Sequence, residues 1–185
     1  MDSPQPAGIA PKKYLRAVLT SAANIAPTLP DYALFSQLPG ASPSLAPRLL
    51  AAFGEQRERF LDANEIQKYS GIPPVTERSG KKSWVHWRWQ CPPFVRQTFV
   101  EWVAQTINKS FWSGAHYPQQ RDKGSSHQAA VRALAFKWIR ILYRCWQTRT
   151  PYDESTALNA LKRRGSAQVD EMIQVLRQFQ LRAAA

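Results

Sequence analysis

Ser79 is the residue whose neighbours best suit it for chemistry on an anionic group. It precedes Gly80, and a Ser-Gly pair after an extended run indicates a tight turn, because glycine accepts a positive φ. The cations of this stretch are Arg78, Lys81, Lys82 and Arg88. A serine hydroxyl held among cations suits nucleophilic attack on a phosphate, because the cations stabilise the negative charge that develops. A polar turn on a nucleic-acid-binding surface has the same composition, and both interpretations stay open.

The residues that follow this turn alternate between two kinds of side chain. Apolar and polar residues take turns from Val85 to Gln90, in the order Val85, His86, Trp87, Arg88, Trp89 and Gln90. Period-two alternation predicts an extended segment with an aromatic side and a polar, basic side. His86 is the only nearby candidate for a general base, and we do not expect it to act as one.

Positive charge is concentrated in one part of the chain. The 185 residues include 25 Lys and Arg against 13 Asp and Glu, a formal net charge of +12. The range from Arg78 to Arg149 holds 13 basic and 2 acidic residues, which is nearly all of the excess. Such a local excess favours a polyanion partner, DNA or RNA, over a role in general solubility. A membrane surface is a less suitable partner, because no segment combines a basic face with a strongly apolar face that is not needed for the protein core.

A long helix is predicted from Ser125 or Ser126, either of which is a suitable N-cap, to about Gln147. Its expected core face consists of Val131, Leu134, Ala135, Trp138, Ile141, Leu142 and Cys145. Six cations lie on its other faces or in the link before it: Arg121, Lys123, Arg132, Lys137, Arg140 and Arg144. Uncompensated cations at close helical spacing repel one another, and an anionic partner relieves that cost. We therefore predict nucleic-acid contact here, with a plain solvated face as the alternative.

The cysteines, the histidines and the hydropathy exclude several classes of protein. Cys91 and Cys145 are too few for a disulfide framework, and no Cys-x-x-Cys pair exists. The three histidines are scattered, so no metal site is predicted. The sequence has neither a signal-peptide pattern nor eighteen consecutive apolar residues. We therefore expect a protein of the reducing cytoplasm.

The first third of the chain reads as a loose leader followed by short helices. After a proline-rich start, Lys12 to about Asn24 is expected to be helical. Thr28 and Asp31 are spaced as a capping box before a short helix through Leu34 and Phe35. The segment LPGASP at 38–43 and the helical run 45–53 then resemble a helix-hairpin-helix, whose backbone N–H groups hold a phosphate. Because the usual pattern has a second glycine at the position of Ser42, a plain helix–helix connection is the alternative.

The sequence pattern after residue 61 also predicts helices. Asp62 and Glu65 form a capping box, and Gly71 ends the helix that they begin. The later helices are expected at Phe94–Trp112, ending before Gly114, at Asp153–Lys162, and from Ser166 onward. The fold class is therefore mainly α: a compact multi-helix domain with a helix-hairpin-helix-like start and at most one small β-hairpin around Ser79.

Three separated motifs together resemble one bacterial family. They are LPGASP at 38–43, QKYSGIPPVTERSGKK at 67–82, and LAFKWIRILYRCWQ at 134–147 followed by TPYDE at 150–154. In order and type they are similar to insertion-sequence transposases of the DEDD-plus-serine type (the IS110 family), some of which are bridge-RNA-guided recombinases. The resemblance covers roughly residues 34–164 and is specific in combination rather than in any single motif.

The resemblance implies a role for Ser79 and a set of partners. The nucleophilic serine of the family lies in the Ser-Gly step after a Gly-x-x-Pro segment, which is Ser79 here. It would attack a DNA phosphodiester, giving a phosphoserine link and a free 3′ hydroxyl. The family further implies a homo-oligomer on DNA, a structured guide RNA in some members, and Mg²⁺ held by an acidic domain that precedes the serine domain. This chain itself is expected to bind no cofactor and no membrane.

The chain looks like the C-terminal part of such a transposase, because residues 1–33 contain no strand pattern and only two carboxylates, Asp2 and Asp31. The expected organisation is a leader with a connecting helix at 1–30, a transposase domain at 31–165, and an amphipathic helix with a tail at 166–185. Two alternatives to a catalytic domain stay open. One is a fragment that binds DNA or RNA without cutting it, and the other is a structural helical protein.

Overall fold

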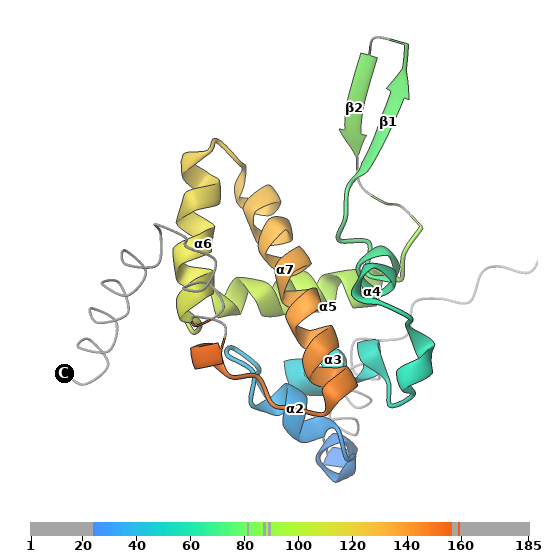
Figure 1. Ribbon diagram of the computed structural model, residues 1–185, viewed down its shortest axis with the longest axis vertical. Helices are drawn as coiled ribbons and strands as arrows, with labels where there is room; N and C mark the ends of the chain where they lie inside the picture. Colours follow the sequence, from blue (N-terminus) through green and yellow to red (C-terminus); the bar gives the residue numbers. More distant parts are fainter. Residues whose placement is uncertain (1–23, 81, 87, 89, 157–158, 160–185) are drawn as a thin grey trace, which may run out of the picture.

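The computed structural model describes residues 24–80, 82–86, 88, 90–156 and 159. This part of the chain is mainly helical and contains one two-stranded antiparallel sheet (Figure 1). The helices are 3₁₀ helices η1 (Ala26–Thr28) and η2 (Arg57–Arg59) and α-helices α2 (Tyr32–Ser36), α3 (Leu45–Phe53), α4 (Ala63–Tyr69), α5 (Pro93–Thr106), α6 (Phe111–Asp122) and α7 (His127–Thr148). The strands are β1 (Val75–Ser79) and β2 (Lys82–His86). The expected mainly α fold and the small hairpin around Ser79 are confirmed.

Helix α7 is the central element, and α4, α5 and α6 pack against it (Figure 1). Its N-cap is Ser126, whose side chain accepts a hydrogen bond from the Ala129 N–H, as the sequence predicts. Of the expected core face, Ile141 and Cys145 are only partly buried, whereas Ile139 and Trp146 are fully buried. The apolar stripe is thus rotated slightly from the one that spacing alone indicates.

A cluster of tryptophans joins α5, α6 and α7. The ring of Trp138 on α7 lies 5.0 Å from that of Trp102 on α5 and 4.8 Å from that of Trp112 on α6. The buried indole N–H of Trp138 donates to Thr106 Oγ1 at 3.1 Å and to Ser113 Oγ at 2.9 Å. Because a buried indole N–H without a partner is costly, these two hydroxyls fix where α5 ends and α6 begins.

The sequence predicted one helix across Phe94–Trp112, ending before Gly114, and this prediction is wrong. Helix α5 ends at Thr106, and α6 begins at Phe111 and continues through Gly114. The N-terminus of α6 is capped by Glu154, whose Oε1 accepts from the N–H groups of Phe111 at 2.5 Å and Trp112 at 3.2 Å. A cap supplied from 43 residues further along the chain leaves no local signal in the sequence.

Of the two predicted capping boxes, one is confirmed and one is wrong. Asp62 accepts from the Glu65 N–H at 2.9 Å, and Glu65 reaches back to the Leu61 N–H at 2.6 Å. By contrast, the Asp31 side chain makes no cap hydrogen bond. It is buried and accepts two hydrogen bonds from Arg57, at 2.6 and 2.7 Å. The Asp31 carboxylate, which local spacing assigned to the N-terminus of a helix, therefore pairs with Arg57, a cation distant in the sequence.

Helices α2 and α3 lie where the sequence predicted a helix-hairpin-helix-like start, and the turn between them packs on α5. The Pro39 carbonyl accepts from Trp102 Nε1 at 3.1 Å. Gly40 has a φ of 74°, and a Cβ there would lie 2.9 Å from the Cβ of Gln105. The Leu45 N–H bonds to Ser42 at 3.0–3.2 Å, so Ser42 satisfies the start of α3. The phosphate-binding role of this turn stays a prediction.

Some expectations fall on residues that the structure does not describe. These are the leader, most of the helix expected at Lys12–Asn24, the helix from Ser166, and most of that expected at Asp153–Lys162, of which residues 154–156 are helical. The expected domain boundaries stay predictions. Within the described ranges, none of the helices has the length and apolar character needed to cross a membrane.

Candidate functional site

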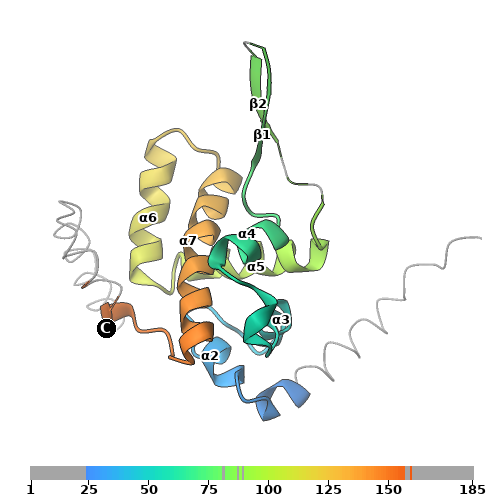
Figure 2. The same cartoon turned by 45° about the vertical axis from the view of Figure 1, so that its right-hand side comes forward.

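Ser79 lies at the tip of a hairpin that projects from the helical body (Figures 1 and 2). It is the last residue of β1 and pairs with Lys82, the first residue of β2. Only Gly80 and Lys81 connect the strands, and Gly80 has a φ of 58°. Two-residue hairpin loops require a positive φ at their first position, which glycine supplies without strain. The Ser-Gly step is therefore the sequence feature that makes this tip.

The base of the hairpin is fixed by close packing between its two ends. Gly71, which precedes β1, has a φ of 68°, and a Cβ there would lie 2.3 Å from Cys91 Sγ. Cys91, which follows β2, is thus in direct contact with the Gly71 backbone. Ile72 is buried in the core, and Arg96 of α5 donates to the Arg88 carbonyl at 3.3 Å. The core thus holds both legs of the hairpin and leaves its tip exposed.

The predicted cations around Ser79 do not all lie beside it. Lys82 is directly opposite, and paired residues project from the same face of a sheet. Arg78 pairs with Ser83 and so projects from the other face. Arg88 follows β2 and is half-buried at the base of the hairpin, more than about 13 Å from the tip at the usual rise per residue of a strand. Lys81 is outside the described residues.

Glu77 is a residue of the site that sequence reasoning missed. It lies two positions before Ser79, on the same face. Its carboxylate contacts His86 Nε2 at 2.8 Å and accepts from Trp84 Nε1 at 3.1 Å. The hydrogen bond to His86 is the main cause that holds the pKa of Glu77 below its ordinary value. The period-two spacing from Ser79 was the available signal, because it places Glu77 on the face of the serine.

His86 is turned toward Glu77 and lies away from Ser79 along the hairpin. It pairs with Val75, four positions from the Ser79–Lys82 pair. At about 3.3 Å per residue this separates the two positions by roughly 13 Å, beyond the reach of a direct proton transfer. The expectation that His86 is not the general base stays a prediction.

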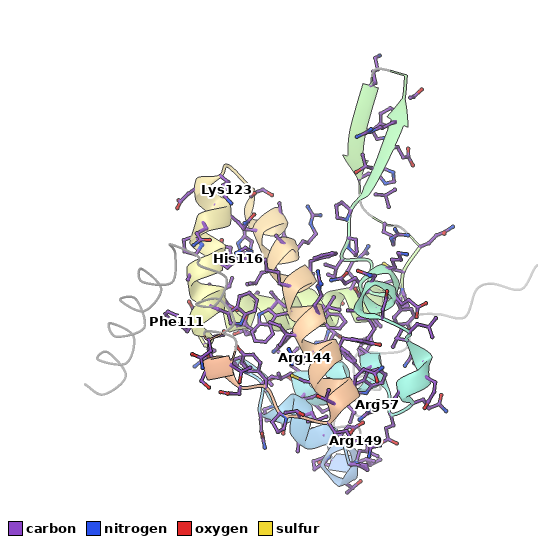
Figure 3. All side chains as sticks on the ribbon, in the orientation of Figure 1. Arg57, Phe111, His116, Lys123, Arg144 and Arg149 are labelled. Carbon is purple, nitrogen blue, oxygen red and sulfur yellow. The ribbon has the colours of Figure 1, made fainter. Side chains whose placement is uncertain are left out.

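Three of the four cations predicted on α7 form an exposed surface that has no ion pair with a carboxylate in the described part of the chain. Lys137, Arg140 and Arg144 are exposed, and Arg132 is half-buried. Among the described residues, no carboxylate forms an ion pair with Lys137, Arg140 or Arg144. Figure 3 shows Arg144 toward the C-terminal half of α7. We call Lys137, Arg140 and Arg144 the α7 cations.

The two predicted cations at the end of α6 have different surroundings. The Arg121 guanidinium donates to the Ser125 carbonyl at 2.9 Å and so helps to hold the α6–α7 loop. Lys123 is exposed, is the C-cap residue of α6 and lies at the same loop (Figure 3). Both views place this loop and the Ser79 hairpin at the same end of the molecule (Figures 1 and 2). One extended polyanion is therefore geometrically suited to run along both.

The contact that His116 makes was also not predicted from the sequence, in which the three histidines are scattered. It is buried on α6, and its Nδ1 lies 3.4 Å from Nζ of Lys137 on α7. Burial, followed by the charges of Lys137 and Lys123, lowers the pKa of His116 to about 4. Although Lys137 as a whole residue is exposed, its Nζ is partly buried against His116, and this burial lowers the pKa of Lys137, with a contribution from Lys123. No local pattern could have revealed this contact, because 21 residues separate its two members.

The described residues do not provide a metal site. No group of three His, Cys, Asp or Glu among them is placed to hold a metal ion. The Mg²⁺ that the family resemblance implies for a preceding acidic domain stays a prediction.

The chain is similar to known transposases. Residues 32–119, from α2 to α6, match the model of the Transposase IS116/IS110/IS902 family. The "Mini-circle putative transposase for IS117" of Streptomyces coelicolor is 34% identical over 131 residues, which are 71% of this chain and 32% of that protein. The chain thus spans about a third of the length of this curated relative. It carries a transposase domain of the IS116/IS110/IS902 family.

Proposed function

We propose that this chain acts in DNA transposition as a DNA-binding domain, and that Ser79 is its nucleophile. In this reaction the Ser79 oxygen forms a bond to phosphorus, and the bond from phosphorus to the 3′ oxygen breaks. The serine proton leaves, and the departing oxygen takes up a proton to become a 3′ hydroxyl. The products are a phosphoserine link to the 5′ end and a free 3′ end.

The position of Ser79 is the observation that carries the proposal. A hydroxyl at the exposed tip of a projecting hairpin can approach a phosphodiester without interference from the helical body. Lys82 is the described cation directly opposite it and is placed to stabilise the negative charge on the phosphoryl oxygens. Glu77 is already engaged by His86 and Trp84, so its negative charge is partly compensated where the phosphate would enter.

The α7 cations support the DNA-binding part of the proposal. Exposed Lys and Arg side chains without acidic partners bind backbone phosphates and release counterions, largely without regard to sequence. RNA phosphates have the same charge, so the surface also suits the guide RNA that is used by some members of the family. Assembly as a homo-oligomer on DNA is part of the same proposal and follows from the family resemblance alone.

A covalent-trapping experiment tests the nucleophile. The chain is incubated with element-end DNA and a separately supplied acidic domain of a related transposase, and protein that stays on DNA in denaturing gels is measured. Ser79→Ala should abolish this product. Ser83→Ala is the matched control. Ser83 lies in the same hairpin, but its cross-strand partner is Arg78, whereas the partner of Ser79 is Lys82. Equal trapping by wild type and Ser79→Ala would show that Ser79 is not the nucleophile.

A non-catalytic binding fragment is the second candidate function, and the unpaired α7 cations favour it equally. It predicts salt-sensitive binding of DNA or RNA together with no covalent product from any variant. Binding that does not respond to salt would contradict both candidates. The trapping experiment and a binding titration together therefore distinguish them.

A further inference from the structure

The contact between His116 and Lys137 is unusual because it joins two potential cations. Their nitrogens are 3.4 Å apart, and Lys123 is the other charged group that acts on His116. No carboxylate is among the groups that shift the pKa of His116 or of Lys137. A lysine ammonium only donates hydrogen bonds, so this contact requires a neutral imidazole that accepts at Nδ1. The hydrogen of His116 is then on Nε2.

Each of these three side chains can donate a hydrogen bond, His116 through its Nε2–H, and among the described residues no carboxylate forms an ion pair with Lys123 or Lys137. Lys123 comes from the C-terminal end of α6 and His116 from the middle of that helix (Figure 3). Lys137 lies on α7, where its Nζ faces His116. Burial and mutual repulsion disfavour charge on His116, and burial also disfavours charge on Lys137. An anion in contact with His116, Lys123 and Lys137 would stabilise the charged forms of His116 and Lys137, and would so offset the burial and the repulsion that disfavour them.

We propose that His116, Lys123 and Lys137 form a binding site for one backbone phosphodiester of a nucleic acid, and that His116 changes from an acceptor to a donor when the site fills. The phosphodiester is a suitable ligand because it is ionised at every relevant pH and offers two oxygens to several donors. Lys137 then donates to the phosphate instead of to Nδ1. His116 takes up a proton from solvent and adds a charge-assisted hydrogen bond.

This inference rests on the proposed binding of nucleic acid and adds to it a specific site and a proton. Binding raises the pKa of His116 from its value of about 4, because the anion stabilises the imidazolium. By linkage, affinity therefore increases as the pH falls from the pKa of His116 in the complex toward its pKa of about 4 in the free chain. A rise of one pKa unit corresponds to a tenfold preference of the anion for the protonated site, about 1.4 kcal/mol.

The experiment is an NMR titration of the histidine Cε1–Hε1 signals between about pH 3 and pH 8, so that the range extends below the His116 pKa of about 4 in the free chain. It compares the free chain with the chain saturated by a duplex DNA of about two helical turns, or by a hairpin RNA of similar length. With at least one of the two nucleic acids, the pKa of His116 should rise by one unit or more and by more than that of His127. His127 is the matched reference because it lies at the start of α7, is exposed, and contacts Tyr117 through its Nδ1.

The outcomes separate this inference from the proposed function. If nucleic acid binds while His116 keeps its pKa, or shifts no more than His127, the phosphodiester site is wrong and the proposed function stands. If neither nucleic acid binds at all, both are wrong. A rise with DNA alone or with RNA alone identifies the source of the phosphodiester.

A variant provides an independent check that does not depend on replacing the buried histidine. Lys137→Met should raise the pKa of His116 in the free chain and leave it below 6.5, because burial rather than Lys137 is the larger cause of the shift. The same variant should weaken nucleic-acid binding several-fold and reduce the rise of the His116 pKa on binding. Lys68→Met, at an exposed position on α4, should do none of these. Equal losses of affinity in the two variants would overturn the site.

Discussion

Ser79 and Lys82 are directly opposite one another where β1 and β2 begin to pair. The two side chains project from the same face of the hairpin, and both residues are exposed. A serine is thereby held next to a flexible cation on a surface that a DNA backbone can reach. Their relationship predicts that the lysine contributes to the chemical step more than to binding.

Replacing Lys82 by Met should slow formation of the covalent product by roughly tenfold to a hundredfold, because one group that stabilises the developing phosphoryl charge is lost. Lys82→Arg should retain more of the rate. The rate of product formation at saturating DNA is the appropriate measurement, with DNA affinity determined in parallel. Lys109→Met, at an exposed position between α5 and α6, is the control. Equal slowing in both variants would mean that only overall charge matters.

The conformation of Gly80 leads to a second prediction. Its φ is 58°, and a Cβ at this position would meet no atom within 4 Å, so Gly80→Ala strains the backbone by about 1–2 kcal/mol without a clash. Gly124 in the α6–α7 loop has a φ of 82° and equally open surroundings. Both alanine variants should fold and unfold within a few degrees of wild type. At saturating DNA, where a loss of affinity in the α6–α7 loop has no effect, only Gly80→Ala should reduce covalent trapping, because only it displaces Ser79. A similar reduction by Gly124→Ala under this condition would contradict the prediction.

Features set by neighbouring residues were predictable from the sequence. The hairpin follows from the Ser79-Gly80 step and the alternation after it, and the start of α7 follows from Ser126. The placement of Ser79 at an exposed turn needed nothing beyond this local pattern. The charge of the α7 surface was likewise visible, because helical spacing alone separates its cations from the core face.

Features set by residues distant in the sequence were not predictable. The break between α5 and α6 depends on Glu154, which caps a helix that begins 43 residues earlier. Asp31 was assigned to a local cap but pairs with Arg57 across the fold. The pKa of His116 is lowered first by burial in the fold and then by Lys137 on another helix. In each case a polar side chain is satisfied or perturbed by a long-range contact that local spacing does not encode.

The Asp31–Arg57 pair predicts how stability depends on pH. The hydrogen bonds from Arg57 are the main cause that lowers the pKa of Asp31 below 3.8. Because the pKa is lower in the folded state, the pair stabilises the fold fully above the unfolded pKa and loses this contribution as the pH falls through the folded pKa. Asp31→Asn should therefore cost about 2–3 kcal/mol at pH 7, and less below about pH 4.

Urea unfolding of wild type and Asp31→Asn between pH 2.5 and 7 measures this difference. Glu58→Gln is the control because Glu58 lies in the same short 3₁₀ helix as Arg57 and is exposed. It should change the free energy of unfolding little at any pH. A difference between wild type and Asp31→Asn that stays constant across the range would mean that the Asp31 carboxylate is not responsible.

Glu154 predicts a local effect on α6. Glu154→Ala removes acceptors from the Ser110 hydroxyl and from two N–H groups at the start of the helix, and should cost about 1–2 kcal/mol of stability. Hydrogen exchange should accelerate most at the amides of Phe111 and Trp112. Asp122→Ala, at the opposite end of the same helix, should be neutral or slightly stabilising because a negative charge there opposes the helix dipole. Uniform acceleration of exchange along α6 in Glu154→Ala would argue against a capping role.

The α7 cations predict the salt dependence of DNA binding. Each phosphate contact contributes about 0.9 to the slope of log affinity against log salt concentration, so Arg140→Gln with Arg144→Gln should reduce the slope by roughly 2. Because both residues are exposed and form no ion pair within the described part of the chain, the fold should keep its stability. The double variant Lys68→Gln with Lys109→Gln removes the same charge from other surfaces, and its slope should stay close to that of wild type. If both double variants lower the slope equally, DNA responds to the net charge of the protein and the α7 cations are not a binding surface.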